Sequence, residues 1–160
     1  MRRGFCKWVW VAVSMAAWAF AGQSDVPEIL QGTWKIDVEA SIASLKESSR
    51  FADAEPEALA RLPRQVRHQA DITTVTIGES SMVGQRRLLR RSADLHLVKS
   101  EANRWVYSTE EIEVDENGKP IRKPGGEVIF KLREDGLLSM ISEQHEEMNP
   151  YLWRKAGETQ

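Results

Sequence analysis

The stretch Leu30-Gln31-Gly32-Thr33-Trp34-Lys35-Ile36-Asp37-Val38 decides the fold that the sequence predicts. In an extended chain, Trp34, Ile36 and Val38 share one face, while the residues between them are polar and share the other. An alternation of period two is typical of a strand with one buried face. We therefore predict that residues 30–38 form the first strand of a mainly β domain.

The chain after residue 70 continues this alternation in seven further segments. Turn residues separate the segments, with Asn117-Gly118 and Asp135-Gly136 as the clearest hairpin signals. Residues 119–126 contain two prolines and two glycines, and they are predicted to be a loop. The predicted strands are 71–78, 82–91, 95–100, 104–115, 127–133, 137–144 and 151–155.

A helical insertion is predicted between the first and second strands, at about residues 40–69. This part is rich in Ala, Glu, Arg and Leu, and its apolar residues recur at helical spacing, as in Leu59, Leu62 and Val66. Pro63 falls inside this pattern, so we expect a kink or a break there. The fold class is then a mainly β, antiparallel barrel of about eight strands, or a sandwich. A barrel removes the exposed edges that a sheet must otherwise protect.

The N-terminus has the layout of a secretory signal peptide. Arg2, Arg3 and Lys7 precede an apolar run at residues 8–20, and Ala19-Phe20-Ala21 is a small-residue cleavage site. We predict cleavage after Ala21, leaving a single domain at residues 22–160 in the periplasm or secreted. A retained membrane anchor is the alternative, although the run is short for a membrane span. The arginine pair also resembles a twin-arginine export signal, so either that route or the general secretory route is open.

Removal of residues 1–21 changes the composition of the chain. The segment holds three basic residues and no acidic one, so the formal net charge falls from −2 to −5. A mildly acidic domain is a poor candidate for nucleic-acid binding. Cys6, the single cysteine, also leaves, so the mature chain has no disulfide, no thiolate ligand and no cysteine nucleophile.

The segment Leu30-x-Gly32-x-Trp34-x-Ile36-Asp37 resembles the opening of bacterial lipocalin-like, calycin-type domains of unknown function. The resemblance implies a barrel, and it implies that Trp34 packs under an arginine near the end of the chain, for which Arg154 is the candidate. Gly32, Trp34 and Arg154 are then structural residues at the closed end. The other signature motifs of the classical lipocalins are not evident, and the helix follows strand one instead of lying near the C-terminus.

Residues that could carry chemistry are scattered. His68, His96 and His145 have no partner at metal-ligand spacing, and no Gly-x-Ser-x-Gly or phosphate-binding glycine loop occurs. Adjacent pairs such as Glu110-Glu111 would point to opposite faces of a strand, so they do not form an acid-base pair. We predict no enzyme activity, no metal and no cofactor.

The segment Arg86-Arg87-Leu88-Leu89-Arg90-Arg91 departs from the alternation, because each face of such a strand carries arginines. One interpretation is an exposed edge, where arginine blunts pairing between sheets. The other is that Arg86 and Arg90, or Arg87 and Arg91, reach into the barrel toward an anionic head group or balance glutamates. The predicted ligand-binding residues are Arg86, Arg90, Trp105, Tyr107, Phe130 and Met140, although the apolar ones among them could equally be core.

The sequence favours an exported, non-catalytic protein that binds a small apolar or amphipathic ligand. In one version of this hypothesis, the ligand also carries a negative charge. The alternative is a structural or interaction module of the cell envelope, with a filled barrel that binds a protein partner. An internal void with arginines at its mouth would favour the first hypothesis, and a filled interior with an exposed apolar patch on the insertion would favour the second.

Overall fold

The computed structural model describes residues 26–142 and 149–157. The predicted signal peptide, His145 and the end of the predicted strand 137–144 lie outside the described residues. Three helical segments follow the first strand, and seven strands come after them. The elements are β1 (Gly32–Ile36), α1 (Val38–Glu47), η1 (Ser49–Phe51), α2 (Pro56–Ile72), β2 (Thr73–Ile77), β3 (Ser81–Arg86), β4 (Leu89–Glu101), β5 (Arg104–Val114), β6 (Pro120–Leu132), β7 (Leu138–Ser142) and β8 (Leu152–Lys155).

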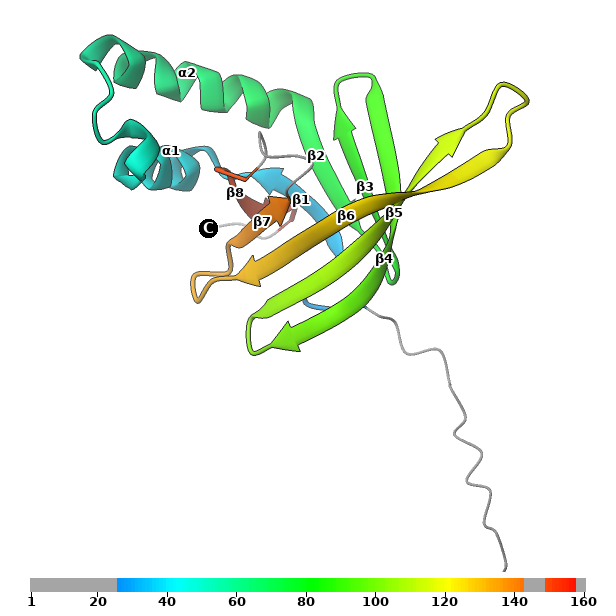
Figure 1. Ribbon diagram of the computed structural model, residues 1–160. Coiled ribbons are helices and arrows are strands. Elements are labelled where there is room, and N and C mark those ends of the chain that lie inside the picture. The colour runs from blue at the N-terminus through cyan, green and yellow to red at the C-terminus, as the bar shows by residue number, and fades with distance from the viewer. Residues whose placement is uncertain (1–25, 143–148, 158–160) are drawn as a thin grey trace, which may run out of the picture.

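The eight strands form a closed barrel in which each strand pairs with the next and β1 pairs with β8. Every pairing is antiparallel. The helices α1 and α2 lie side by side beyond one end of the barrel, which we call the helical end (Figure 1). The prediction of a mainly β, eight-stranded barrel with a helical insertion after the first strand is confirmed.

The opposite end of the barrel is closed by the segment that precedes β1. Val26 and Leu30 in this segment are fully buried. The indole Nε1 of Trp34 donates a hydrogen bond of 2.8 Å to the carbonyl oxygen of Leu30. The barrel interior also contains the large, fully buried side chains of Tyr107 and Phe130, whose ring centroids are 5.6 Å apart. This half of the barrel is a packed core.

The cation over Trp34 is Lys155, so the prediction that Arg154 packs there is wrong by one residue. Lys155 Nζ lies 5.9 Å from the centroid of the Trp34 ring. The register explains the difference, because Trp34 pairs with Lys155 while Lys35 pairs with Arg154, and paired residues share a face. Gly32, with φ of +128°, lies under the same lysine, since an added Cβ would be 2.8 Å from Lys155 Cε.

Arg154 instead joins β8 to the start of α1. Its Nε donates a 2.6 Å hydrogen bond to Oδ2 of Asp37, and Oδ1 of Asp37 accepts the Ala40 amide as the N-cap of α1. Ser41 is fully buried one turn into α1, and its hydroxyl oxygen accepts the amide of Leu152 at 2.9 Å. These contacts fix the helical insertion to the seam between β1 and β8.

The free energy of unfolding should depend on the charge of Asp37. Burial raises the pKa of the Asp37 carboxyl, but the hydrogen bonds from Ala40 and Arg154 outweigh it and hold the pKa below its ordinary value. A lowered pKa adds stability above the unfolded-state pKa near 4, and this contribution is lost as the pH falls through the folded-state value. We expect D37N to lower the unfolding free energy by about 1–2 kcal/mol at pH 7 and by progressively less below about pH 4.

Chemical denaturation of the wild type and of D37N across this pH range is the measurement. Glu39→Gln is the matched control, because Glu39 is exposed in the first turn of the same helix. A difference between D37N and the wild type that stayed constant down to pH 2 would contradict the role of the Asp37 charge.

Two predicted boundaries between residues 82 and 100 are wrong. The predicted strand 82–91 contains a turn: β3 ends at Arg86, and Arg87, at φ of +54°, begins the link to β4. The predicted division near residues 92–94 is absent, because β4 runs through it. The helix α2 continues past Pro63, so of the kink or break expected there the break does not occur, and the kink stays a prediction. Among the described residues, the arginine-rich segment is therefore a hairpin tip and not an unbroken strand.

The predicted loop at residues 119–126 is mostly strand. β6 begins at Pro120 and pairs with β5 in a ribbon that extends past the barrel (Figure 1). The register skips at Thr109, where β6 has one residue more than β5, and this bulge contains Gly126 at φ of +77°. Glycine and proline thus mark a bulge and an exposed ribbon here instead of a loop.

Candidate functional site

A cavity of about 220 Å³ occupies the half of the barrel nearer the helical end. Much of its wall is apolar, with Val75, Met82, Ala93, Val128 and Met140 facing it from five strands. Val128 and Met140 pair with the core residues Tyr107 and Phe130, so the cavity adjoins the packed core. Arg86, Leu89 and Arg91 line the cavity and are exposed, so the cavity is open to solvent beside them.

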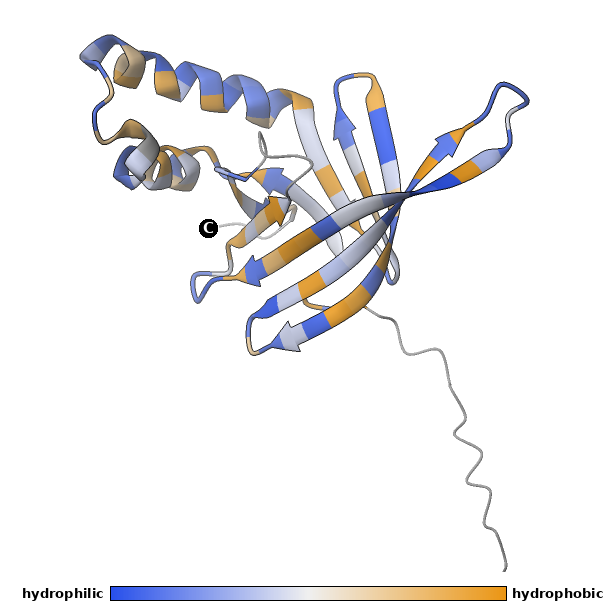
Figure 2. Ribbon diagram, in the orientation of Figure 1, coloured by the Kyte–Doolittle hydropathy of each residue, from blue (hydrophilic) through white to orange (hydrophobic). Residues whose placement is uncertain are grey.

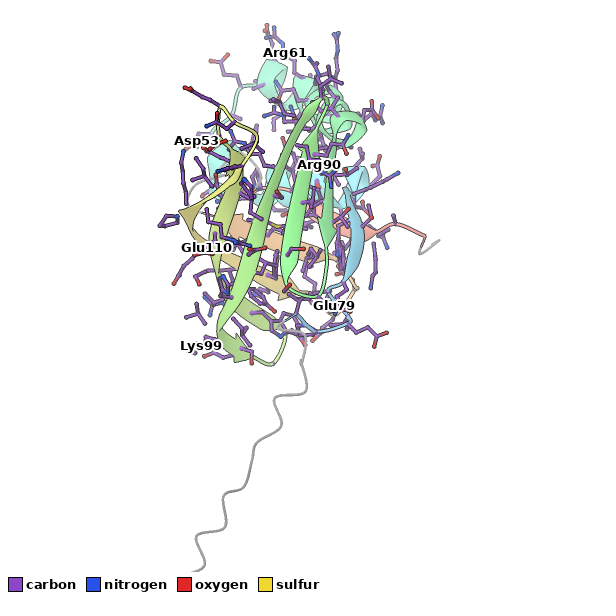
Figure 3. All side chains as sticks on the ribbon, turned by 90° about the vertical axis from the view of Figure 1, so that its right-hand side faces the viewer. Asp53, Arg61, Glu79, Arg90, Lys99 and Glu110 are labelled. Carbon is purple, nitrogen blue, oxygen red and sulfur yellow. The ribbon has the colours of Figure 1, made fainter. Side chains whose placement is uncertain are left out.

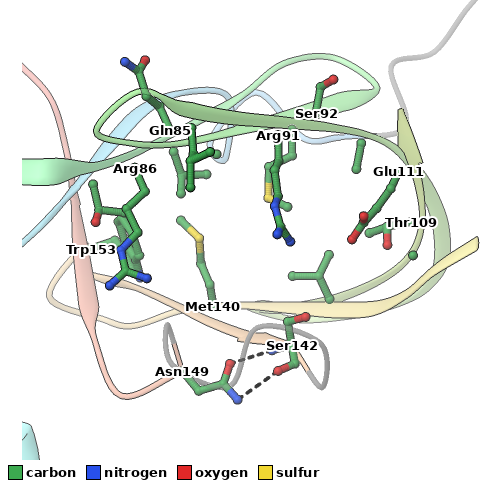
Figure 4. A pocket seen from close by; sticks show the side chains of 18 residues that line it. Gln85, Arg86, Arg91, Ser92, Thr109, Glu111, Met140, Ser142, Asn149 and Trp153 are labelled. Carbon is green, nitrogen blue, oxygen red and sulfur yellow. Dashed lines mark hydrogen bonds between the residues drawn. The ribbon is translucent and has the colours of Figure 1, made fainter. Parts of the chain in front are cut away.

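Four of the cavity residues belong to one row that crosses the strands near the helical end. Arg86 pairs with Thr73 on one side and with Leu89 on the other. On β1, Ile36 pairs with Trp153, and its neighbour Lys35 pairs with Thr74. The row therefore runs from β8 to β4, and its cavity-lining members are Trp153, Thr73, Arg86 and Leu89. Figure 4 shows Arg86 and Trp153 at the same end of the cavity.

Two members of this row are buried hydrogen-bonding groups without a partner. Thr73 Oγ1 and Trp153 Nε1 have no hydrogen-bond partner among the described residues, although Thr73 is only 3% exposed and Trp153 is 0% exposed. An unpaired polar group costs about 1–3 kcal/mol when buried, so most such groups in native proteins are paired with protein or water. Both residues line the cavity, and their two polar atoms lie just behind its accessible surface.

The end of the cavity opposite Arg86 and Trp153 also contains polar side chains. The Thr109 hydroxyl donates to the carbonyl oxygen of Gly126 at 3.1 Å. The side-chain amide of Asn149 makes two hydrogen bonds at the end of β7, because its Oδ1 accepts the Ser142 amide and its Nδ2 donates to the Ser142 carbonyl (Figure 4). Glu111 adds a carboxylate at this end. At the opposite end, Arg86 supplies a guanidinium, a group suited to an anion.

The structure brings together only part of the predicted ligand-binding set. Arg86 and Met140 line the cavity. Trp105, Tyr107 and Phe130 are buried in the core and are not among the lining residues. Arg90 lies on the outer surface of the barrel (Figure 3), and Arg91 takes the inward position because the turn at Arg87 shifts the alternation. Sequence reasoning missed Thr73 and Trp153, since nothing local marks them as unpaired.

Other chemical candidates are on the surface. His68 Nε2 lies 3.1 Å from a guanidinium nitrogen of Arg87, and His96 lies 3.7 Å from Glu110. Within residues 26–142 and 149–157, no three histidines, cysteines or carboxylates form a metal-binding group. The same residues include no helix long and apolar enough to cross a bilayer.

The fold and the cavity together define a closed antiparallel barrel with an open internal site. No model of a known protein family, no curated protein and no solved structure matches the chain. The geometry of the site is therefore the guide to its function.

Proposed function

We propose that this protein is a non-catalytic carrier or receptor for a small amphipathic anion, held inside the barrel. The observation that supports the proposal most is the pair of unpartnered buried donors, Thr73 Oγ1 and Trp153 Nε1, in the wall of an otherwise largely apolar cavity. Binding sites of this kind combine an apolar lining with a few polar groups that fix orientation. The interior void also favours ligand binding over a side-chain-filled interaction module.

The ligand is a carboxylate or similar oxyanion with an apolar body. The two donors and the Arg86 guanidinium lie in one row, and a guanidinium is well suited to bind a carboxylate. The apolar body would contact Met82, Val128 and Met140. A volume near 220 Å³ is below the roughly 300–1,000 Å³ of drug-sized pockets, so the cavity favours a ligand with a short apolar body.

Native mass spectrometry of protein purified without detergent, followed by solvent extraction, tests the proposal first. A reproducible adduct that is lost on denaturation would identify the ligand class. Titration calorimetry with fatty acids and alcohols of equal chain length then tests the oxyanion, and we expect the acids to bind more tightly. A bare protein mass together with no binding by either series would refute the proposal.

Thr73→Val should separate ligand binding from folding. The substitution keeps the shape but removes the unpartnered hydroxyl, so the apo protein should be as stable as the wild type or up to about 1 kcal/mol more stable. Its affinity for the acid should fall by roughly tenfold, which corresponds to one hydrogen bond to a charged group. Calorimetry and thermal unfolding measure the two effects. Thr74→Val, one residue along β2, is the control and should change neither affinity nor stability in this way.

The N-terminal half of the sequence also bears on the family and the cellular location of this protein. The resemblance to lipocalin-like domains fits an open barrel that holds an apolar ligand, and we propose kinship with that group on this basis. The predicted signal peptide supports export to the periplasm or beyond. Cleavage after Ala21 would be tested by the mass of the protein recovered from the cell envelope.

A further inference from the structure

The β3–β4 hairpin ends in a tip, residues Arg86–Arg91, that places two leucines among four arginines. Leu88 is 100% exposed and Leu89 is 71% exposed. All four arginines are exposed as well. Figure 2 shows a short hydrophobic segment at this tip, between hydrophilic segments of the hairpin. Leu88 buries no surface on folding and Leu89 buries little. Exposed apolar side chains grouped together are typical of interaction sites.

The tip is held in place and is continuous with the cavity. The Arg87 amide donates to the carbonyl oxygen of Ile72 at 2.8 Å, and its guanidinium contacts His68 of α2. Arg86, Leu89 and Arg91 belong to both the tip and the cavity wall. Leu88 and Arg90 belong to the tip alone. Whatever the tip contacts is therefore brought to the mouth of the cavity.

The charge of the tip selects an anionic surface. Four arginines lie within six residues, although the chain as a whole has a formal net charge of −2. On the neighbouring β5, Glu113 is paired with Lys123 and Glu110 with Arg122. Glu111 lines the cavity at the end away from Arg86. The tip thus remains a cationic site with an apolar centre. Leucines that enter the interface and arginines that contact lipid phosphates are the two contributions that bind peripheral proteins to acidic bilayers.

We propose that the Arg86–Arg91 tip docks the mouth of the barrel on an acidic phospholipid bilayer. Leu88 and Leu89 enter the interfacial region, and the arginines contact lipid head groups. Docking in this orientation faces the cavity toward the membrane, from which an amphipathic anion could enter the barrel without crossing water. The docking itself does not depend on the proposed ligand.

Vesicle sedimentation tests the docking. The probes are vesicles of phosphatidylethanolamine with phosphatidylglycerol, and vesicles of phosphatidylcholine alone. We expect the wild type to bind the acidic vesicles, to bind the neutral ones weakly, and to dissociate as the salt concentration rises. Leu88→Ser should weaken partitioning by roughly tenfold, and Arg90→Gln should weaken it by about fivefold. Every variant carries the same N-terminus, so the apolar run at residues 8–20 cannot explain a difference between them.

The controls remove an exposed apolar group and a cation elsewhere. Val98→Ser lies toward the other end of β4, and Lys131→Gln lies near the end of β6. Both positions are exposed, and we expect both variants to bind vesicles like the wild type. Equal binding by Leu88→Ser and the wild type would overturn the proposal, as would loss of an envelope protein partner from Leu88→Ser without a change in vesicle binding.

Ligand binding gives an independent readout. Leu88 and Arg90 do not line the cavity, so the affinity of these two variants for ligand in solution should equal that of the wild type. A protein that docks but binds no ligand would refute the proposed function alone. A protein that binds ligand but does not dock would refute the membrane proposal alone.

Discussion

Gly84→Leu should abolish ligand binding without cost to the fold. Gly84 lines the cavity from the middle of β3, and its partners Val75 and Arg91 line it too. A Cβ built on Gly84 has no heavy atom within 4 Å, so a leucine side chain would extend into open space. There it would occupy the volume that the apolar part of a ligand needs. We expect the affinity to fall by about 10–100-fold, since forcing atoms into filled space costs roughly 1–3 kcal/mol.

The same change should leave the apo protein as stable as the wild type, or more stable. Glycine in a strand interior costs about 0.5–1 kcal/mol relative to residues with less backbone freedom, and a leucine would also bury apolar surface in the void. Calorimetry measures the affinity, and thermal unfolding measures the stability. Val83→Leu is the control, because Val83 precedes Gly84 on β3 but is not part of the cavity wall. Unchanged affinity in Gly84→Leu would mean that ligand binds elsewhere.

The barrel could be predicted from the sequence because its strands carry a strong local signal. In β6, Val128 and Phe130 are buried while the residues beside them are exposed or half-buried. Such alternation requires one buried face, and eight such segments without a long hydrophobic helix leave few arrangements. The Gly32-x-Trp34 motif also lies at a place of structural importance, under Lys155 at the closed end.

The hairpin tip was missed because its turn has no turn residues. The two residues between β3 and β4, Arg87 and Leu88, include no Gly, Pro, Asn, Asp or Ser, and Arg87 adopts a left-handed φ that sequence patterns assign to glycine or asparagine. A two-residue turn shifts the alternation, so Arg91 and not Arg90 faces inward along with Arg86. The choice between the two pairs of arginines depended on this one turn.

The candidate site depends on contacts between distant parts of the chain. Trp153 joins the row that contains Thr73 only because β8 closes the barrel against β1. Whether a buried threonine or tryptophan has a partner is a property of that closure and not of either local segment. The alternation predicts that such residues face inward. It does not predict that their donors remain unpaired beside a void.

Gly125→Leu should have the opposite outcome to Gly84→Leu, although both glycines line the same cavity. Gly125 is buried at the bulge in β6, where β5 approaches closely. A Cβ at this position would be 2.4 Å from Thr109 Oγ1, 2.9 Å from Glu111 Cγ and 3.2 Å from the Thr109 carbonyl oxygen. The last of these is a backbone atom of the paired strand, so relief requires the two strands to separate.

We therefore expect Gly125→Leu to lower the free energy of unfolding by about 3 kcal/mol or more, at the upper end of the cost of overpacking. This corresponds to a fall in Tm of roughly 10 °C. The smaller Gly125→Ala should show part of the loss, and adding Thr109→Ala should recover some of it, because the closest contact is with the Thr109 hydroxyl. The backbone contact at 3.2 Å remains in the double variant, so recovery should be incomplete. A Gly125→Leu protein with the Tm of the wild type would show that β5 and β6 are not held at this separation, and the far wall of the cavity would then be adjustable instead of fixed.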